Sequence, residues 1–303
     1  MEENIFEENF KALGTDIYIG IIAPKEETEK ILATFAEVKN IYKRKELTFS
    51  RFNPRSELSK LNNNLGVFQE GSDDIIYLAK KSLDYYLKSD KFFDPRILER
   101  LDGMGYRKNF KENVFDAKDG FLTEIFKKDL AQDLIISGGK VKFLRKIDFS
   151  GIAKGYITDK VAEFLFSRGW RNFLVDSGGD MHASGLNKRG EKWGIALEES
   201  ENENEIIAEI SNEGIATSGN TRKYWEIDGK KFHHLINPKN VDEFSFDLKS
   251  VTVIAGTTQE ADVMAKVLFL MGLEKGLKFS DENRIKSIFL KNDKKIIKSK
   301  RLV

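Results

Sequence analysis

The hydrophobic pattern of this sequence changes between the period of a β-strand and the period of an α-helix, and this change limits the folds that the chain can adopt. Residues 15–21 place Ile17, Ile19 and Ile21 on one face of a strand, because side chains alternate across a strand. The apolar residues that follow recur at helical spacing, which predicts an amphipathic helix over 26–43 packed on that strand. The chain therefore mixes strands and helices.

The same alternation continues along the chain. We expect a helix opened by a serine N-cap, a strand–helix–strand unit, an Asp-Gly hairpin and a final helix opened by a capping box. The segments are the helix 73–88 after Ser72, the strand 141–149, the helix 154–167 closed by Gly169, the strand 172–175, the hairpin strands 223–227 and 231–236 around Asp228-Gly229, the strand 251–254, and a helix after Thr257 that ends near Gly272. No linker rich in Pro, Gly or Ser divides them, which predicts one α+β domain over residues 1–303.

The composition excludes several classes of function. The 303 residues contain no cysteine, so a disulfide framework, a thiolate metal site and a cysteine nucleophile are excluded. Lys and Arg number 50 against 49 Asp and Glu, which favours neither nucleic acid nor an anionic membrane as a partner. No signal peptide, lipid anchor or apolar run of ~18 residues is visible. We expect a cytoplasmic protein, or an exported form without its leader, that recognises a small molecule or a local protein feature.

Five Ser-Gly pairs are predicted to lie in turns or at strand ends. They are 137–138, 150–151, 177–178, 184–185 and 218–219. Glycine lets backbone N–H groups approach a phosphate, although an ordinary tight turn is the better explanation of any single pair. The sequence has neither a Walker loop nor a GxGxxG motif after a strand, which excludes the usual nucleotide-binding folds.

The segment 147–159 carries charges that a plain turn does not need. Asp148 precedes a Ser-Gly pair, and Lys154 lies where the next helix begins, so its charge opposes the helix dipole. Such a conflict is expected where a cation faces an anionic ligand. The alternative is an ion pair of Lys154 with Asp148 or Asp159.

The chain has three histidines, His182, His233 and His234. Neighbouring residues of a strand point to opposite faces, so only one of His233 and His234 can enter a given pocket. That histidine is a candidate general base, and the alternative is a hydrogen-bonded structural histidine.

Asp262 and Lys266 lie four residues apart on the last predicted helix and therefore share a face. A carboxylate beside loop carbonyls is a plausible ligand for Mg²⁺. The same spacing describes an ordinary salt bridge, and the sequence favours neither.

These features occur together, and in a fixed order, in one known family. The segments are ALGT (12–15), FSRFNPRSELSKLN (49–62), FFDP (92–95), IDFSGIAKGYITD (147–159), VDSGGD (175–180), IATSGN (215–220), FHHLINP (232–238) and VTVIAGTTQEADVMA (251–265). In them the chain resembles the ApbE family, the FAD:protein FMN transferases. The resemblance implies a single α+β domain related to the T-fold, with mixed antiparallel sheets and packed helices.

The resemblance implies a Mg²⁺-dependent reaction that splits FAD at its pyrophosphate, attaches FMN to a Thr or Ser hydroxyl of a target protein and releases AMP. It also implies that the acceptor carries the pattern Asp-Gly-x-(Ser/Thr)-Gly-Ala-(Ser/Thr). Phosphoryl transfer needs a cation at the diphosphate, an acceptor oxygen in line and a base for its proton. Two alternatives keep the FAD site: an FAD pyrophosphatase that makes FMN and AMP, and a catalytically silent FAD-binding protein.

Position by position, the resemblance assigns His234 to activation of the acceptor hydroxyl, and Gly151 and Asp262 to the metal. The positions that resemble flavin-contacting ones are Leu13, Phe52, Phe93, Asp94, Pro95, Asp148, Lys154 and Leu235. An imidazole with a pKa near ~6.5 suits a base at neutral pH.

The chain departs from the family pattern at two places. Lys266 stands where Asp-x-x-Ala-Thr supplies a hydroxyl to the metal, and 238–241 replace the Pro-x-Thr-Gly that usually follows the histidine. An ammonium beside a divalent cation is strongly unfavourable. We therefore expect Lys266 to turn toward solvent while Mg²⁺ binds through Asp262 and backbone carbonyls, so that transfer still needs Mg²⁺ and Lys266→Thr lowers the metal concentration required. The alternative is that the ammonium pairs with Asp262 and takes the place of the cation beside the diphosphate.

Overall fold

An antiparallel sheet of eight strands forms the centre of the fold in the computed structural model, which describes residues 3–108, 110, 115, 126–198, 206–221 and 223–302. In spatial order the strands are β1 (Glu3–Ala12), β2 (Thr15–Pro24), β6 (Phe173–Ser177), β7 (Met181–Ser184), β10 (Glu213–Gly219), β13 (Leu248–Ala255), β14 (Lys286–Lys291) and β15 (Ile296–Lys298). Every neighbouring pair is antiparallel. The strands expected at 15–21, 172–175 and 251–254 are confirmed.

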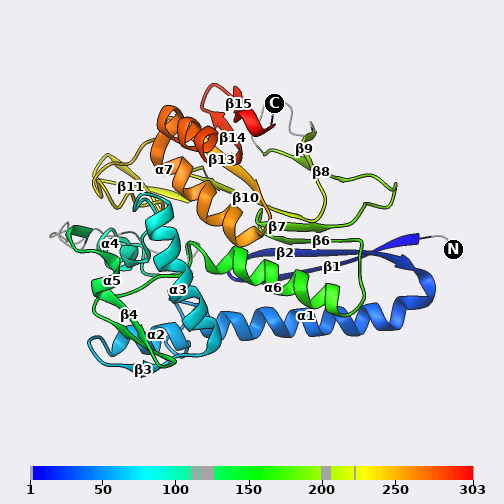
Figure 1. Cartoon of the computed structure of the whole chain (residues 1–303), viewed down its shortest axis with the longest axis horizontal. Helices are drawn as coiled ribbons and strands as arrows, with labels where there is room; N and C mark the ends of the chain where they lie inside the picture. The colour runs from blue at the N-terminus through cyan, green and yellow to red at the C-terminus, as the bar shows by residue number, and fades with distance from the viewer. Residues whose placement is uncertain are drawn as a thin grey trace.

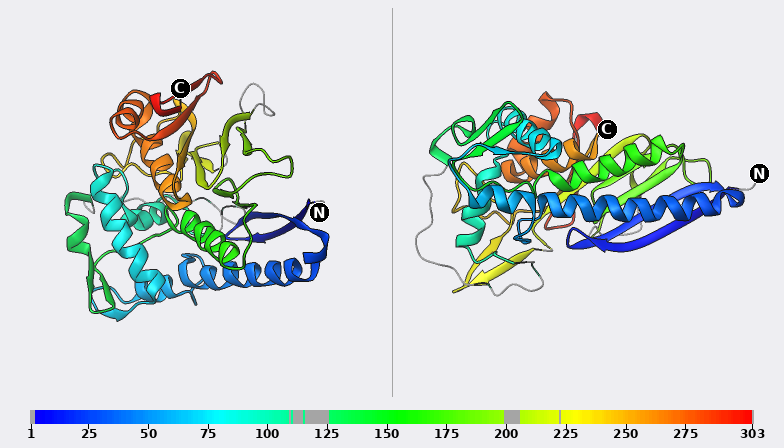
Figure 2. Two further views of the ribbon diagram at one scale, coloured as in Figure 1. Left: turned by 45° about the vertical axis from the view of Figure 1, so that its right-hand side comes forward. Right: turned by 90° about the horizontal axis from the view of Figure 1, so that it is seen from below.

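Three helices cover one face of this sheet: α1 (Thr28–Phe49), α6 (Ala153–Ser167) and α7 (Thr258–Glu282) (Figures 1 and 2). Ile17, Ile19 and Ile21 of β2 are buried in the main core, where Phe35 and Val38 of α1 join them. The predicted packing of the helix at 26–43 on the strand at 15–21 is therefore confirmed, as α1 on β2. The helix is longer than the expected 26–43 and follows a 3₁₀ turn, η1 (Lys25–Glu27).

The opposite face of the sheet packs on a hairpin of β8 (Trp193–Ala196) and β9 (Ile206–Ile210). A second apolar cluster joins Trp193 and Ile195 of the hairpin to Ile22 and Ile254 of the sheet. Both faces of the sheet are thus covered, and the α+β class is confirmed. No helix among the described residues is long and apolar enough to cross a membrane.

Smaller elements form the end of the molecule away from the N-terminus (Figure 1). They are α2 (Glu57–Asn63), β3 (Gln69–Glu70), α3 (Asp73–Lys88), η2 (Pro95–Ile97), α4 (Leu98–Gly103), α5 (Leu130–Asp133), β4 (Leu134–Ser137) and β5 (Lys140–Phe143). The helix expected at 73–88 is confirmed together with its cap, since the Ser72 hydroxyl accepts a hydrogen bond from the N–H of Ile75. The strand expected at 141–149 is wrong beyond Phe143.

Strands β3, β5 and β4 form a separate three-stranded sheet, and the residues after Phe143 leave it because their hydrogen bonds are made elsewhere. The N–H of Asp148 donates to the carbonyl of Pro95 at 2.7 Å, and the Asp148 carboxylate accepts from the N–H of Ser150 at 2.7 Å. The segment therefore becomes a loop that runs from β5 to the start of α6.

The hairpin around Asp228-Gly229 is confirmed as β11 (Tyr224–Ile227) and β12 (Lys230–His233), although β12 ends before the expected Ile236. Thr257 caps α7, as the capping box predicts. The expected end of the first helical segment near Gly272 is confirmed. Gly272 has φ 75° and ψ 178°, so it interrupts the helix, but the chain resumes helical structure and reaches Glu282.

Gly155 lets α6 and α7 approach each other closely. A Cβ atom at this position would lie 2.6 Å from the carbonyl oxygen of Thr258 and 2.7 Å from the Cα of Gln259, both backbone atoms. Backbone cannot move aside as the end of a flexible side chain can. The first turns of the two helices are thereby held together, and the residues that they carry share one site.

We expect Gly155→Ala to lower the free energy of unfolding by about 3 kcal/mol, at the upper end of the usual cost of overpacking. Urea unfolding followed by circular dichroism measures the change. Gly256→Ala is the matched control, since nothing lies within 4 Å of a Cβ built at Gly256. Equal stabilities of the two variants would contradict the close packing of α6 on α7.

Candidate active site

The loop before α6 joins three parts of the chain through Asp148. Its buried carboxylate forms an ion pair with Arg51 at 3.4 Å, and its N–H donates to Pro95 as described above. The Asp148–Lys154 pair that the sequence left open does not form. Arg51 brings Phe52 to the same place, with its guanidinium 4.2 Å from the Phe52 ring.

Lys154, in the first turn of α6, pairs with Asp180 in the turn after β6, with Nζ and Oδ2 2.8 Å apart. The pair with Asp159 is likewise wrong, because the carboxylate of Asp159 accepts from the N–H groups of Thr258 and Gln259. Burial raises the pKa of Asp180 to about 7, although the Lys154 charge opposes that rise. Burial alone would lower the pKa of Lys154, but the nearby carboxylates, first Asp180 and then Asp262, together outweigh it and the pKa is raised.

Gly151, Asp262 and Lys266 meet where the loop faces the first turns of α7. The Lys266 ammonium donates to the Gly151 carbonyl at 2.8 Å and to Oδ1 of Asp262 at 3.2 Å. The expected turn of Lys266 toward solvent is therefore wrong, and the salt bridge that the spacing allowed is present. The other Asp262 oxygen accepts from the N–H of Gly155 at 3.2 Å.

These atoms do not fit Mg²⁺ in the arrangement observed. Mg²⁺ prefers six oxygen ligands at about 2.0–2.1 Å in octahedral geometry. Here the two oxygens assigned to the metal, from Gly151 and Asp262, point at an ammonium instead. Among the residues that the structure describes, no three His, Cys, Asp or Glu side chains are grouped to hold a metal ion.

The two adjacent histidines have different surroundings. His233 is 1% exposed, its ring packs against Phe244, Phe246 and Phe269, and its Nε2 bonds to the Ser245 carbonyl at 3.1 Å. It is a structural histidine.

His234 is half-buried, and its Nδ1 lies 3.4 Å from the carbonyl oxygen of Lys223. Since a carbonyl only accepts, Nδ1 carries the proton and Nε2 keeps its lone pair. Loss of water around the imidazole, and then repulsion by the Lys223 ammonium, hold the pKa of His234 well below 6.5. His234 is therefore a neutral acceptor at physiological pH.

Lys223 was not expected from the sequence, although the hairpin signal could have found it. The Asp228-Gly229 turn pairs Tyr224 with His233, so residue 223 comes opposite His234. Loss of hydration, then repulsion from Lys154 and Arg51, lower the pKa of the Lys223 ammonium to about 8. The site thus gathers four cationic side chains, from Arg51, Lys154, Lys223 and Lys266.

The apolar positions assigned to flavin contact differ in exposure. Phe52 is 40% exposed beside Tyr106, with ring centroids 5.9 Å apart, and the Arg51 guanidinium covers part of its ring. Phe93 and Leu235 are buried in the main core, and Phe93 lies 3.5 Å from a Cβ built at Gly151. Leu13 lies in the β1–β2 turn with φ 54°. Their contacts with a flavin remain predictions.

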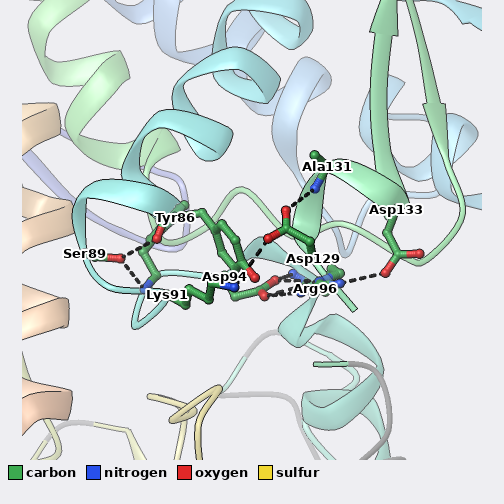
Figure 3. Close-up of polar contacts among 9 residues, drawn as sticks. Tyr86, Ser89, Lys91, Asp94, Arg96, Asp129, Ala131 and Asp133 are labelled. Atoms are coloured by element: carbon green, nitrogen blue, oxygen red, sulfur yellow. Dashed lines mark hydrogen bonds and ion pairs between the residues drawn. The ribbon is translucent and has the colours of Figure 1, made fainter. Parts of the chain in front are cut away.

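The FFDP loop is held by an ion pair that the sequence did not reveal (Figure 3). Arg96, which is 0% exposed, binds the Asp94 carboxylate at 2.6 Å and the Asp133 carboxylate at 2.7 Å. Both Asp94 oxygens accept hydrogen bonds from Arg96, and Pro95 occupies the first turn of η2. The Asp94 side chain thus positions the loop, and its assigned contact with a flavin remains untested.

Comparisons with known proteins identify the family of this chain. The model of the ApbE family matches residues 13–289. The FAD:protein FMN transferase of Haemophilus influenzae is 38% identical over 143 residues, which cover 46% of this chain and 41% of that protein, less than half its length. The protein of the same name from Treponema pallidum is 24% identical over 297 residues, 90% of this chain and 81% of that protein.

Solved structures share the fold. The apo form of the flavinyl transferase ApbE from Pseudomonas stutzeri superposes with a TM-score of 0.83 at 23% identity, covering 99% of this chain and 96% of that one. The ApbE protein from Thermotoga maritima gives a TM-score of 0.85 at 23% identity, with 98% and 97% covered. The family model extends over the loop before α6, the β11–β12 hairpin that precedes His234, and the first turns of α7. The chain is therefore a member of the ApbE family.

Proposed function

We propose that this protein transfers FMN from FAD to a Thr or Ser hydroxyl of a target protein and releases AMP. The observation that carries the proposal is one neutral histidine, His234, near the cationic Lys223 and Lys266, in a site to which Lys154, Arg51 and the partly exposed ring of Phe52 also belong. Cations suit a diphosphate, a neutral imidazole suits proton removal, and an exposed ring suits stacking on a flavin. The names of the relatives support the same reaction.

In the proposed step, the acceptor hydroxyl oxygen attacks the phosphorus of the FMN half of FAD. Its proton passes to Nε2 of His234, and the bond from that phosphorus to the bridging oxygen breaks, so that AMP leaves with that oxygen. Lys154 and Lys223 compensate the negative charge of the diphosphate and of the leaving AMP. The ion pair of Lys154 with Asp180 holds its ammonium in place.

Magnesium, which the family resemblance implies, has no step in this proposal, because the described oxygens of Gly151 and Asp262 bind Lys266. A cytoplasmic location stays a prediction from composition alone.

The test is incubation with FAD and a protein that carries the acceptor pattern. In-gel flavin fluorescence detects covalent FMN, and chromatography quantifies AMP. Equal amounts of bound FMN and AMP support transfer. Free FMN and AMP without a labelled acceptor would identify a pyrophosphatase, and FAD binding without AMP would identify a silent binding protein.

We expect FAD affinity to decrease as the pH rises from 7 to 9. Lys223 is charged below its pKa of about 8 and neutral above it, and only the charged form attracts the diphosphate. The expected loss is about three- to tenfold, modest because the side chain is partly solvated. Flavin fluorescence titration measures this loss. Lys223→Gln should bind FAD more weakly than the wild type, and its affinity should not change between pH 7 and pH 9. If Lys223→Gln lost FAD affinity with pH as the wild type does, Lys223 would not be the group responsible.

A further inference from the structure

The strongest unexplained feature of the site is the surroundings of Lys266. Its side chain is 16% exposed and reaches from α7 to the loop before α6, where it joins the Gly151 carbonyl to the Asp262 carboxylate. A lysine on a helix surface usually extends its ammonium into water. Here both acceptors come from positions that the family resemblance assigns to a metal.

The backbone at residue 151 leaves room for this ammonium. A Cβ atom at Gly151 would lie 3.2 Å from Nζ of Lys266, closer than side-chain packing usually allows, and 3.4 Å from Cε, an ordinary contact. Glycine at this position is therefore compatible with the lysine, whereas a larger residue would press on it.

Asp262 is fixed for the same interaction. One of its oxygens accepts from the Gly155 N–H at the start of α6, and the other accepts from Lys266. Because Gly155 also sets the close approach of α6 and α7, the carboxylate has little freedom to turn away. The negative charge that would attract a divalent cation is already compensated by a tethered one.

An ammonium has three N–H donors, and Gly151 and Asp262 account for two of them. The third is suited to an ionised phosphate oxygen. Lys266 also lies near enough to His234 for its charge to lower the pKa of that imidazole. Its ammonium therefore lies in the region where the proposed reaction places the diphosphate.

We propose that the Lys266 ammonium replaces a divalent cation in this site, so that the protein binds FAD and transfers FMN without a metal ion. The inference rests on the proposed function and specifies its electrostatics. The bonds made and broken are those of the proposed step, and the positive charge beside the diphosphate comes from a side chain.

Three variants on α7 test the proposal. Lys266→Thr removes the ammonium and restores a small hydroxyl side chain, and Lys266→Met removes the charge but keeps most of the length. Lys278→Thr is the matched control, since Lys278 lies on the same helix with its side chain 76% exposed. Manganese binding is measured by electron paramagnetic resonance, and FAD affinity by fluorescence titration in EDTA and in millimolar Mg²⁺.

We expect the wild type and Lys278→Thr to leave Mn²⁺ free in solution. Their FAD affinities in EDTA and in Mg²⁺ should agree within about twofold. Lys266→Thr should bind FAD about tenfold or more weakly in EDTA, recover in Mg²⁺, and bind Mn²⁺. Lys266→Met should bind FAD more weakly than the wild type in both EDTA and Mg²⁺.

Wild-type protein that binds Mn²⁺ tightly, or that needs Mg²⁺ to bind FAD, would overturn the proposal; this measurement needs no variant to fold. A failure of the proposed function gives a different result. In that case FAD binds without a metal ion, but an acceptor protein receives no FMN.

Discussion

We expect His234→Ala to lower the rate of FMN transfer by about 10²–10⁴-fold while FAD affinity stays within about twofold of wild type. Loss of a positioned general base has a cost of this size. The base acts on the proton of the acceptor, so the FAD site keeps its cations. The measurement is the initial rate of covalent flavin incorporation, together with fluorescence titration of FAD.

His233→Ala is the control for this experiment. His233 is buried among three phenylalanine rings, so the variant should unfold at a lower temperature yet transfer FMN where it is folded. Transfer that survives the loss of His234 but not the loss of His233 would show that the base is assigned to the wrong ring.

The pH dependence gives a second test of His234. Loss of hydration and the Lys223 charge hold the pKa of His234 well below 6.5, so the neutral imidazole should persist at pH values where an ordinary histidine gains a proton. The transfer rate should therefore show no protonation step near 6.5, the pKa of an ordinary histidine. A clear fall centred near pH 6.5 would contradict a low pKa for this residue.

The sequence predicted the parts of the fold that depend on neighbours along the chain. Ser72 and Thr257 cap their helices, and Asp228-Gly229 forms its hairpin, because each needs only residues a few positions away. The strand expected to reach residue 149 failed because Asp148 bonds to Pro95, which is distant along the chain. The helix expected to end near Gly272 does break there, at a glycine with positive φ, but the helical segment that follows it, up to Glu282, was not expected.

The site shows the same limit. Spacing along the chain offered partners for Lys154 within six residues, but its partner is Asp180, which the β6–β7 turn brings to α6. Lys266 was expected to avoid the metal position because its long side chain can reach solvent. In the described structure the Gly151 carbonyl and the Asp262 carboxylate hold the ammonium there, and the first of these contacts is not visible in the sequence.

The largest expected effect on stability is that of Arg96→Met. Arg96 is fully buried between Asp94 and Asp133, and its removal leaves two buried carboxylates without their shared cation. Breaking a buried pair in this way costs about 3–5 kcal/mol. We expect the free energy of unfolding, measured in urea at pH 7, to fall by this amount.

Arg168→Met is the matched control, because Arg168 makes an exposed ion pair with Glu37 whose loss should cost about 0–1 kcal/mol. The loss of stability caused by Arg96→Met should become smaller as the pH falls from 7 to 4, since protonation of Asp94 removes an uncompensated charge. The pKa of Asp94 is already raised by burial, against the pull of Arg96, so it should be raised further once the guanidinium is gone. A loss of stability that is the same at both pH values would mean that Arg96 stabilises the FFDP loop by packing rather than by charge.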